Sequence, residues 1–181
     1  GYCNALCKLG YSAPVVLARE TVKKLLTGQD LPKSGNEIIE SELWNEHKSC
    51  FVSIKKLNGE LRGCIGTLSP LHESLDKEII ANAVSASTRD PRFLPMTSTE
   101  LDNVIISVDV LSEPQAITSP SELDVKKFGV IVSQGYKRGV LLPDLEGVDS
   151  VEQQINIAAM KAGIYDLSNI NLERFEVVRY K

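Results

Sequence analysis

Two residues on one short segment, Arg62 and Cys64, are the ones best suited to chemistry in this sequence of 181 residues. On a β-strand, residues two apart project from the same face, with Cα atoms roughly 6.6 Å apart. A cation at that distance favours the thiolate, which lowers the pKa of the cysteine and raises its reactivity. Together with the backbone N–H groups of Gly63 and Gly66, the cation also suits a carboxylate or phosphate. The spacing therefore indicates either thiol chemistry or the binding of a small anion.

A predicted β-hairpin gives this pair its neighbours. The dipeptide Asn58-Gly59 lies between two extended segments and is typical of a two-residue turn. Counting outward from such a turn pairs Lys55 with Arg62 and Ser53 with Cys64. These four side chains are then expected on one face of the hairpin. The apolar residues of the two strands are expected on the opposite face, toward the core: Val52, Ile54 and Ile65.

A second polar segment, from Arg89 to Arg92, surrounds Pro91. Asp90 is expected to accept hydrogen bonds from nearby backbone N–H groups, as aspartate does in turns. Either arginine can also join Arg62 as a clamp for an anion.

The histidines and the remaining cysteines give weaker signals. His72 is one of only two histidines, and a Cys64–His72 pair is the one nucleophilic dyad that the composition allows. A histidine in such a position more often faces solvent or caps a helix, and a strand cysteine is often a small buried hydrophobe. Cys3 and Cys7 have no second pair of ligands, and no other acidic, cysteine or histidine residues show metal-ligand spacing. We therefore expect neither a metal nor a cofactor.

The order of the predicted elements favours an α+β fold with mainly antiparallel pairing. Helices are expected at 14–27, around Trp44, from Ser69-Pro70 to the residues before Asp90-Pro91, and at 150–161. Strands are expected at 50–57, 60–67, 103–111, 128–133, 136–142 and 173–180. No internal repeat is visible in the sequence.

Composition narrows the function classes. The net charge of -4 argues against a general nucleic-acid binder, and no apolar run approaches the roughly 20 residues that a membrane helix needs. No secretory signal is visible, so we expect a cytoplasmic protein with free thiols.

The segment Leu61-Arg62-Gly63-Cys64-Ile65-Gly66-Thr67 resembles the LRGCIG signature of the AMMECR domain family. The resemblance continues at Asp90-Pro91-Arg92-Phe93, at 139–143 and at Lys161-Ala162-Gly163. It implies a single α+β domain over residues 1–181, with a core at 14–178 and two unequal lobes with a groove between them. It implies no settled reaction. In prokaryotes such domains often stand beside or are fused to a Memo-like, dioxygenase-like domain, and near a radical SAM protein. A chain that begins at Gly1 would fit the C-terminal part of such a fusion.

Three functional hypotheses follow. The first is a ligand-binding or accessory domain that works with a Memo-like or radical SAM partner and holds a small anionic ligand or a modified protein segment along Arg62-Gly63-Cys64. The second is a thiol-dependent enzyme with Cys64 as nucleophile or redox centre. The third is a scaffold, in which the motif serves folding alone and its glycines pack against another element.

Overall fold

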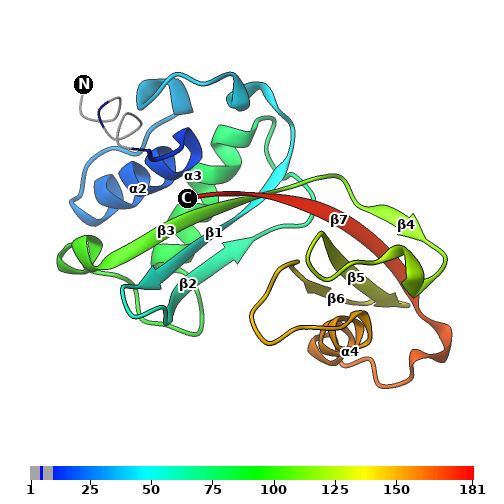
Figure 1. Cartoon of the computed structure of the whole chain (residues 1–181). Helices are drawn as coiled ribbons and strands as arrows, with labels where there is room; N and C mark the ends of the chain where they lie inside the picture. The colour runs from blue at the N-terminus through cyan, green and yellow to red at the C-terminus, as the bar shows by residue number, and fades with distance from the viewer. Residues whose placement is uncertain (1–4, 6–9) are drawn as a thin grey trace. The chain divides into compact units, whose positions relative to one another are not determined.

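The computed structural model describes residue 5 and residues 10–181, and the chain forms two compact units. Unit 1 comprises Gly1–Leu111 and Val178–Lys181, and unit 2 comprises Ser112–Val177. Both combine helices with antiparallel strands, so the α+β expectation is confirmed (Figure 1). Cys3 and Cys7 lie outside the described residues.

Among its described residues, unit 1 has helices α2 and α3 on one face of an antiparallel sheet. The elements are α2 (Ala13–Leu26), β1 (Ser49–Lys56), β2 (Leu61–Gly66), α3 (Leu75–Thr88) and β3 (Val104–Leu111), with short 3-10 helices at Gly35–Glu37, Glu42–Asn45 and Ser98–Asn103. The strand order is β2-β1-β3, and the last residues of β7 lie beside β3. This order makes β2, the strand that carries Cys64, an edge of the sheet.

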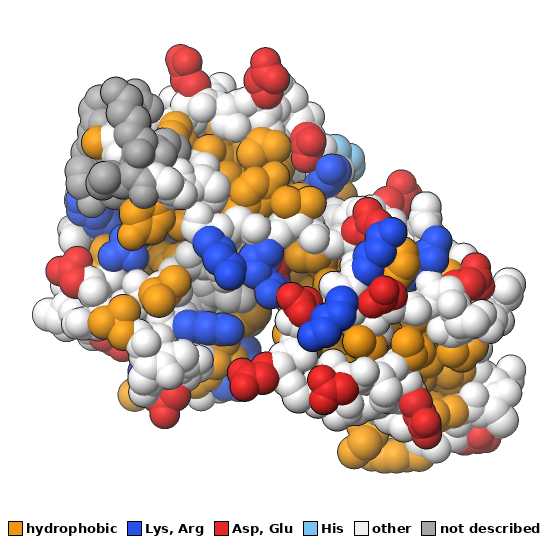
Figure 2. Space-filling view, in the orientation of Figure 1, with side chains coloured by type: hydrophobic (Ala, Val, Ile, Leu, Met, Phe, Trp, Pro, Cys, Tyr) orange, Lys and Arg blue, Asp and Glu red, His pale blue; other side chains and the backbone are white. Residues whose placement is uncertain are grey.

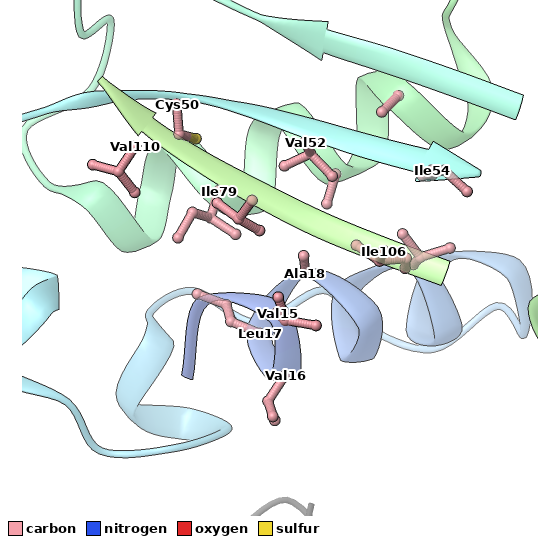
Figure 3. Packing of buried hydrophobic residues seen from close by; sticks show 14 of the residues in the cluster. Val15, Val16, Leu17, Ala18, Cys50, Val52, Ile54, Ile79, Ile106 and Val110 are labelled. Atoms are coloured by element: carbon pink, nitrogen blue, oxygen red, sulfur yellow. The ribbon is translucent and has the colours of Figure 1, made fainter. Parts of the chain in front are cut away.

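The core of unit 1 explains the alternation in its strands. Val52 and Ile54 of β1 and Ile106 of β3 point toward the helices, where Ala18 and Ile79 meet them (Figure 3). Full burial of each large apolar side chain contributes roughly 1.5–3 kcal/mol to folding. The opposite face of these strands is therefore left for residues with another role.

Unit 2 is built from β4 (Gln115–Ile117), β5 (Phe128–Gln134), β6 (Lys137–Leu141), α4 (Val151–Lys161) and β7 (Asn171–Tyr180), with 3-10 turns at Pro120–Glu122 and Leu167–Asn169. β5 lies between β6 and β7, and β4 pairs with β7. Helix α4 covers β5 and β6 and closes a separate apolar core that includes Val130, Val132 and Ala158.

The two units repeat one topology, although no internal repeat is visible in the sequence. Each is a β-β-α-β unit in which the first strand is the middle one: β1 pairs with β2 and β3, and β5 pairs with β6 and β7. The second strand of each carries an Arg-Gly dipeptide. A Cβ on Gly63 would lie 2.0 Å from the carbonyl oxygen of Ala86 in α3, and one on Gly139 would lie 1.8 Å from that of Ala158 in α4. The sequence does not reveal the repeat because the two units have few identical residues at matched positions.

One helix boundary differs from its prediction. Helix α3 begins at Leu75 rather than after Ser69-Pro70. The Glu78 carboxylate, 1% exposed, accepts hydrogen bonds from the N–H groups of Leu71 and His72, which holds these residues in a loop before the helix. Among the described helices, none is long and apolar enough to cross a membrane.

Candidate functional site

The hairpin that carries Cys64 has a longer turn than expected and then a bulge. Lys56 and Glu60 close the turn through a backbone hydrogen bond, so three residues, 57–59, lie between this pair, with Gly59 at φ 90°. Lys55 consequently pairs with Leu61 and not with Arg62. Arg62 is the extra residue of a bulge, which restores the expected pairing of Ser53 with Cys64. The predicted neighbourhood of Lys55 and Arg62 was therefore wrong, and that of Ser53 and Cys64 is confirmed.

Arg62 is occupied by a structural ion pair. Its Nε donates to Glu100 Oε1 at 2.8 Å and its Nη2 donates to Oε2 at 3.3 Å. The bond to Arg62 is the first reason that the pKa of Glu100 lies below its usual range. Only 11% of the Arg62 side chain is exposed. Arg62 therefore ties β2 to the turn that leads into β3, and the expectation that it activates Cys64 is wrong.

The glycines of the motif allow close packing. Gly63 lies against α3 as described above, and a Cβ on Gly66 would lie 2.3 Å from the Phe51 ring. At these two positions the scaffold hypothesis is therefore supported by geometry.

The Cys64 thiol lies in a polar, half-buried setting. Its Sγ is 3.1 Å from the Ser53 hydroxyl oxygen. Burial raises the pKa of the Cys64 thiol, whereas the Ser53 hydrogen bond and then the Arg92 charge act to lower it. Because burial dominates, the thiol is neutral at neutral pH, and the expected shift toward thiolate was wrong.

Asp90 and Arg92 clip the outer edge of β2 at Cys64. The Cys64 N–H donates to Asp90 Oδ2 at 3.0 Å, and Arg92 Nη2 donates to the Cys64 carbonyl at 3.2 Å. Arg92 also holds Asp90 through its Nε at 3.0 Å, its Nη2 at 2.8 Å and its backbone N–H at 3.1 Å. The Arg92 side-chain bond is the main reason that the pKa of Asp90 is strongly lowered. The expected turn role of Asp90 is confirmed, and Arg92 is the cation that reaches Cys64.

A polar row crosses the sheet face opposite the helices. Ser53 of β1 pairs with Cys64 on one side and with Ser107 of β3 on the other. Two residues along β3, Asp109 is 3% exposed and accepts two hydrogen bonds from Arg179, at 2.7 and 3.0 Å. Ser107 and Asp109 could be recognised in the sequence because they alternate with valine and isoleucine in β3. Nothing in the sequence pointed to Arg179, which lies far along the chain.

Unit 2 provides an internal comparison for this face. Ile54 pairs with Gly63 and Ile106, as Val132 pairs with Gly139 and Leu172. Counting from these matched positions sets three polar residues of unit 1 against apolar ones in unit 2: Cys64 against Val140, Ser53 against Ile131, and Asp109 against Phe175. The cation on the edge carbonyl is common to both, because Lys161 Nζ donates to the Val140 carbonyl at 3.0 Å. The edge cation therefore recurs in both units, whereas Cys64, Ser53 and Asp109 are polar in unit 1 alone; Ser107 matches Glu173, which is also polar.

The remaining predicted residues lie away from this row. His72 is exposed in the loop before α3, and the groups that act on the Cys64 thiol are Ser53, Arg92, Asp109 and Asp90. Arg89 is exposed at the C-terminus of α3 and Lys55 near the hairpin turn. Within the part of the chain that the structure describes, no three acidic, cysteine or histidine side chains group as metal ligands.

Comparisons with known proteins agree with the motif. The AMMECR1 family model matches residues 15–181. A protein of Thermotoga maritima is 48% identical over 147 residues, which cover 81% of this chain and 84% of that protein. A protein of Clostridium acetobutylicum is 44% identical over 92% of this chain, which spans only 35% of that longer protein. The crystal structure of an uncharacterised protein from Pyrococcus horikoshii superposes with a TM-score of 0.83 at 28% identity, covering 92% of this chain and 88% of that one. The chain therefore belongs to the AMMECR1 family.

Proposed function

We propose that this chain is a cytoplasmic ligand-binding domain that holds a small anionic group beside Cys64, using Arg92 as the cation. The proposal keeps the binding role expected from the sequence and moves it from Arg62 to Arg92. The ligand contacts the sheet face of unit 1 at Cys64, Ser53 and Ser107.

The state of Arg92 is the observation that carries the proposal. Its Nε and Nη2 are used by Asp90 and Cys64, whereas its Nη1 makes no hydrogen bond to any described residue. The side chain is 54% exposed although the Asp90 side chain that orients it is only 2% exposed. A guanidinium held in one orientation with a free donor suits a carboxylate or phosphate oxygen. Polar side chains at positions that are apolar in unit 2 add hydroxyl and thiol groups for the rest of the ligand.

The same geometry weighs against a thiol enzyme. The thiolate is the nucleophile in cysteine chemistry, and burial raises the pKa of Cys64. No histidine acts on the thiol among the described residues. A neutral thiol beside a serine hydroxyl serves better as a polar contact than as an attacking group.

The partner is part of the proposal. We infer that the domain acts with a Memo-like or radical SAM protein, as the family resemblance implies. The Clostridium relative supports an association with further domains, because about two thirds of its length lies outside the region that this chain matches. If the polar face serves such a partner, replacing Arg92 weakens binding between the purified proteins more than replacing Arg89 does.

The direct experiment is an anion titration followed by amide chemical shifts. Phosphate and acetate are added to the protein, to Arg92→Gln and to Arg89→Gln. We expect saturable shifts in β2 and in residues 89–93 for the native protein and for Arg89→Gln, and their loss in Arg92→Gln. Arg89 is the matched control because it is an exposed arginine three residues away with no contact to Cys64. Arg92→Lys keeps the charge and is expected to retain part of the response.

Two results would overturn the proposal. One is an equal response in the two glutamine variants, which assigns the anion to another surface. The other is the absence of a saturable shift at any site in the native protein and in Arg92→Lys, when both proteins have the same fold.

A further inference from the structure

A cavity of about 400 Å³ opens in unit 1, and Cys64, Ser53 and Ser107 are not among its lining residues. It lies where the first turns of α2, the start of β3 and the tip of the β1–β2 hairpin come together, and Val15, Val16 and Ile106 are among its lining residues. This volume is within the range of small-molecule sites, roughly 300–1,000 Å³.

Exposed apolar side chains contribute to the lining of the cavity. Leu57 at the hairpin tip is 64% exposed and Ile105 on β3 is 56% exposed, and both line the cavity. Hydrophobic side chains are visible among Lys and Arg side chains on the surface of unit 1 (Figure 2). Exposed apolar residues gathered around a hollow are a feature of binding sites, whereas single ones are ordinary.

A cation without an acidic partner lies in the same cavity. Arg19 is half-buried, and its guanidinium donates to the carbonyl oxygens of Leu101, at 2.7 Å, and Val104, at 3.3 Å. No described aspartate or glutamate forms an ion pair with it, although Asp102 lines the cavity. A half-buried charge with only neutral partners is costly, and a ligand carboxylate would offset that cost. Lys181 also lines the cavity, so cationic side chains outnumber acidic ones there.

We propose that this cavity binds a small amphipathic carboxylate, whose apolar chain lies on Leu57 and Ile105 while its carboxylate meets Arg19. The chemical class is that of a short fatty acid. None of its lining residues belongs to the anion site at Arg92.

Octanoate is the probe, and octyltrimethylammonium is a cation with the same chain. In calorimetric titrations at neutral pH we expect saturable binding of octanoate and binding of the cation that is weaker by about tenfold or more, since like charges at Arg19 repel. Arg19→Gln keeps an amide that can donate to Leu101 and is expected to remove the preference for the carboxylate.

Two exposed strand residues give a matched pair of variants. Ile105→Asp places a carboxylate in the cavity lining and is expected to weaken octanoate binding by about tenfold or more. Val178→Asp is the control, because Val178 is 55% exposed in the same unit and does not line the cavity. Thermal unfolding of both variants checks that they fold.

Several outcomes contradict the proposal. They are no saturation by octanoate, equal affinity for the cationic probe, and equal binding by the two aspartate variants. Self-association of the protein in sedimentation velocity, lost in Ile105→Asp and kept in Val178→Asp, would instead identify a second copy of the chain as the occupant.

Discussion

Cys64 is subject to opposing influences. Burial favours the neutral thiol, while the Ser53 hydrogen bond and the Arg92 charge favour the thiolate less strongly. Cys50, on the buried face of the same sheet, has no exposed surface, and burial raises its pKa to about 12. The two thiols therefore differ mainly in access to solvent.

This difference predicts a pH profile for alkylation. The reaction rate of Cys64 in the native protein is expected to keep rising beyond about pH 8.5, the ordinary thiol pKa. In Arg92→Gln the whole profile is expected to shift to higher pH, because the charge that lowers the pKa is lost. Cys50 is expected to react only on unfolding. Peptide mass spectrometry at each pH gives both rates. A Cys64 rate that levels off below neutral pH would mean a thiolate and would restore the enzyme hypothesis.

Asp90 predicts an acid dependence of stability. Its pKa is lowered in the folded protein, so it stabilises the fold above the ordinary aspartate pKa of about 4, and this contribution is lost as the pH falls toward the folded-state pKa. We expect Asp90→Asn to be less stable than the native protein at neutral pH, with a smaller further loss between about pH 4 and pH 2. Urea unfolding across this range measures both. If the free energy of unfolding had the same pH dependence in the two proteins, the lowered pKa of Asp90 would not be the cause of the acid dependence.

Arg62 illustrates how a β-bulge changes the partner of a side chain. The motif suggested a cation beside the thiol, but the bulge turns Arg62 to Glu100. Arg62→Ala is therefore expected to lower the free energy of unfolding by about 2 kcal/mol, as the loss of charged hydrogen bonds does. Anion titration of the folded variant is expected to match that of the native protein. Unchanged stability together with loss of anion binding would return Arg62 to the site.

At the scale of elements, the paired glycines join each second strand to its helix. Gly63→Ala and Gly139→Ala each place a methyl group against a helix carbonyl, at 2.0 and 1.8 Å. Each change is expected to cost about 1–3 kcal/mol, the range for overpacking in a rigid core. Hydrogen exchange is expected to show faster opening of α3 in the first variant and of α4 in the second. Loss of protection in the same elements in both variants would contradict separate packing of the two units.

Elements were more predictable than the details between them. Apolar periodicity placed 14–27 within one residue of α2, and alternation placed 103–111 within one residue of β3, because both patterns are local. The three-residue turn and the bulge at Arg62 were not predictable, since two irregularities that cancel leave the pairing of Ser53 with Cys64 unchanged. The start of α3 depends on the buried Glu78 carboxylate, which is a tertiary interaction.

At the scale of the whole molecule, the chain uses one β-β-α-β topology twice. Only the Arg-Gly dipeptide marks the repeat in the sequence, so pairing patterns were needed to find it. The repeat separates two kinds of residue in the motif. Gly63 corresponds to Gly139, which has the same packing role, whereas the residues of unit 2 that correspond to Cys64 and Ser53 are apolar. The proposed site therefore combines Cys64 and Ser53, which are polar in unit 1 alone, with an edge cation that both units have.

Protection of Cys64 from alkylation by phosphate tests this account most directly. The rate at Cys64 is measured by peptide mass spectrometry with and without phosphate at constant ionic strength, in the native protein, Arg92→Gln and Arg89→Gln. An anion held by Arg92 covers the thiol, so phosphate is expected to slow the reaction in the native protein and in Arg89→Gln, and to leave it unchanged in Arg92→Gln. A rate at Cys64 that ignores phosphate, or that falls equally in both variants, would contradict a site at Arg92 and Cys64.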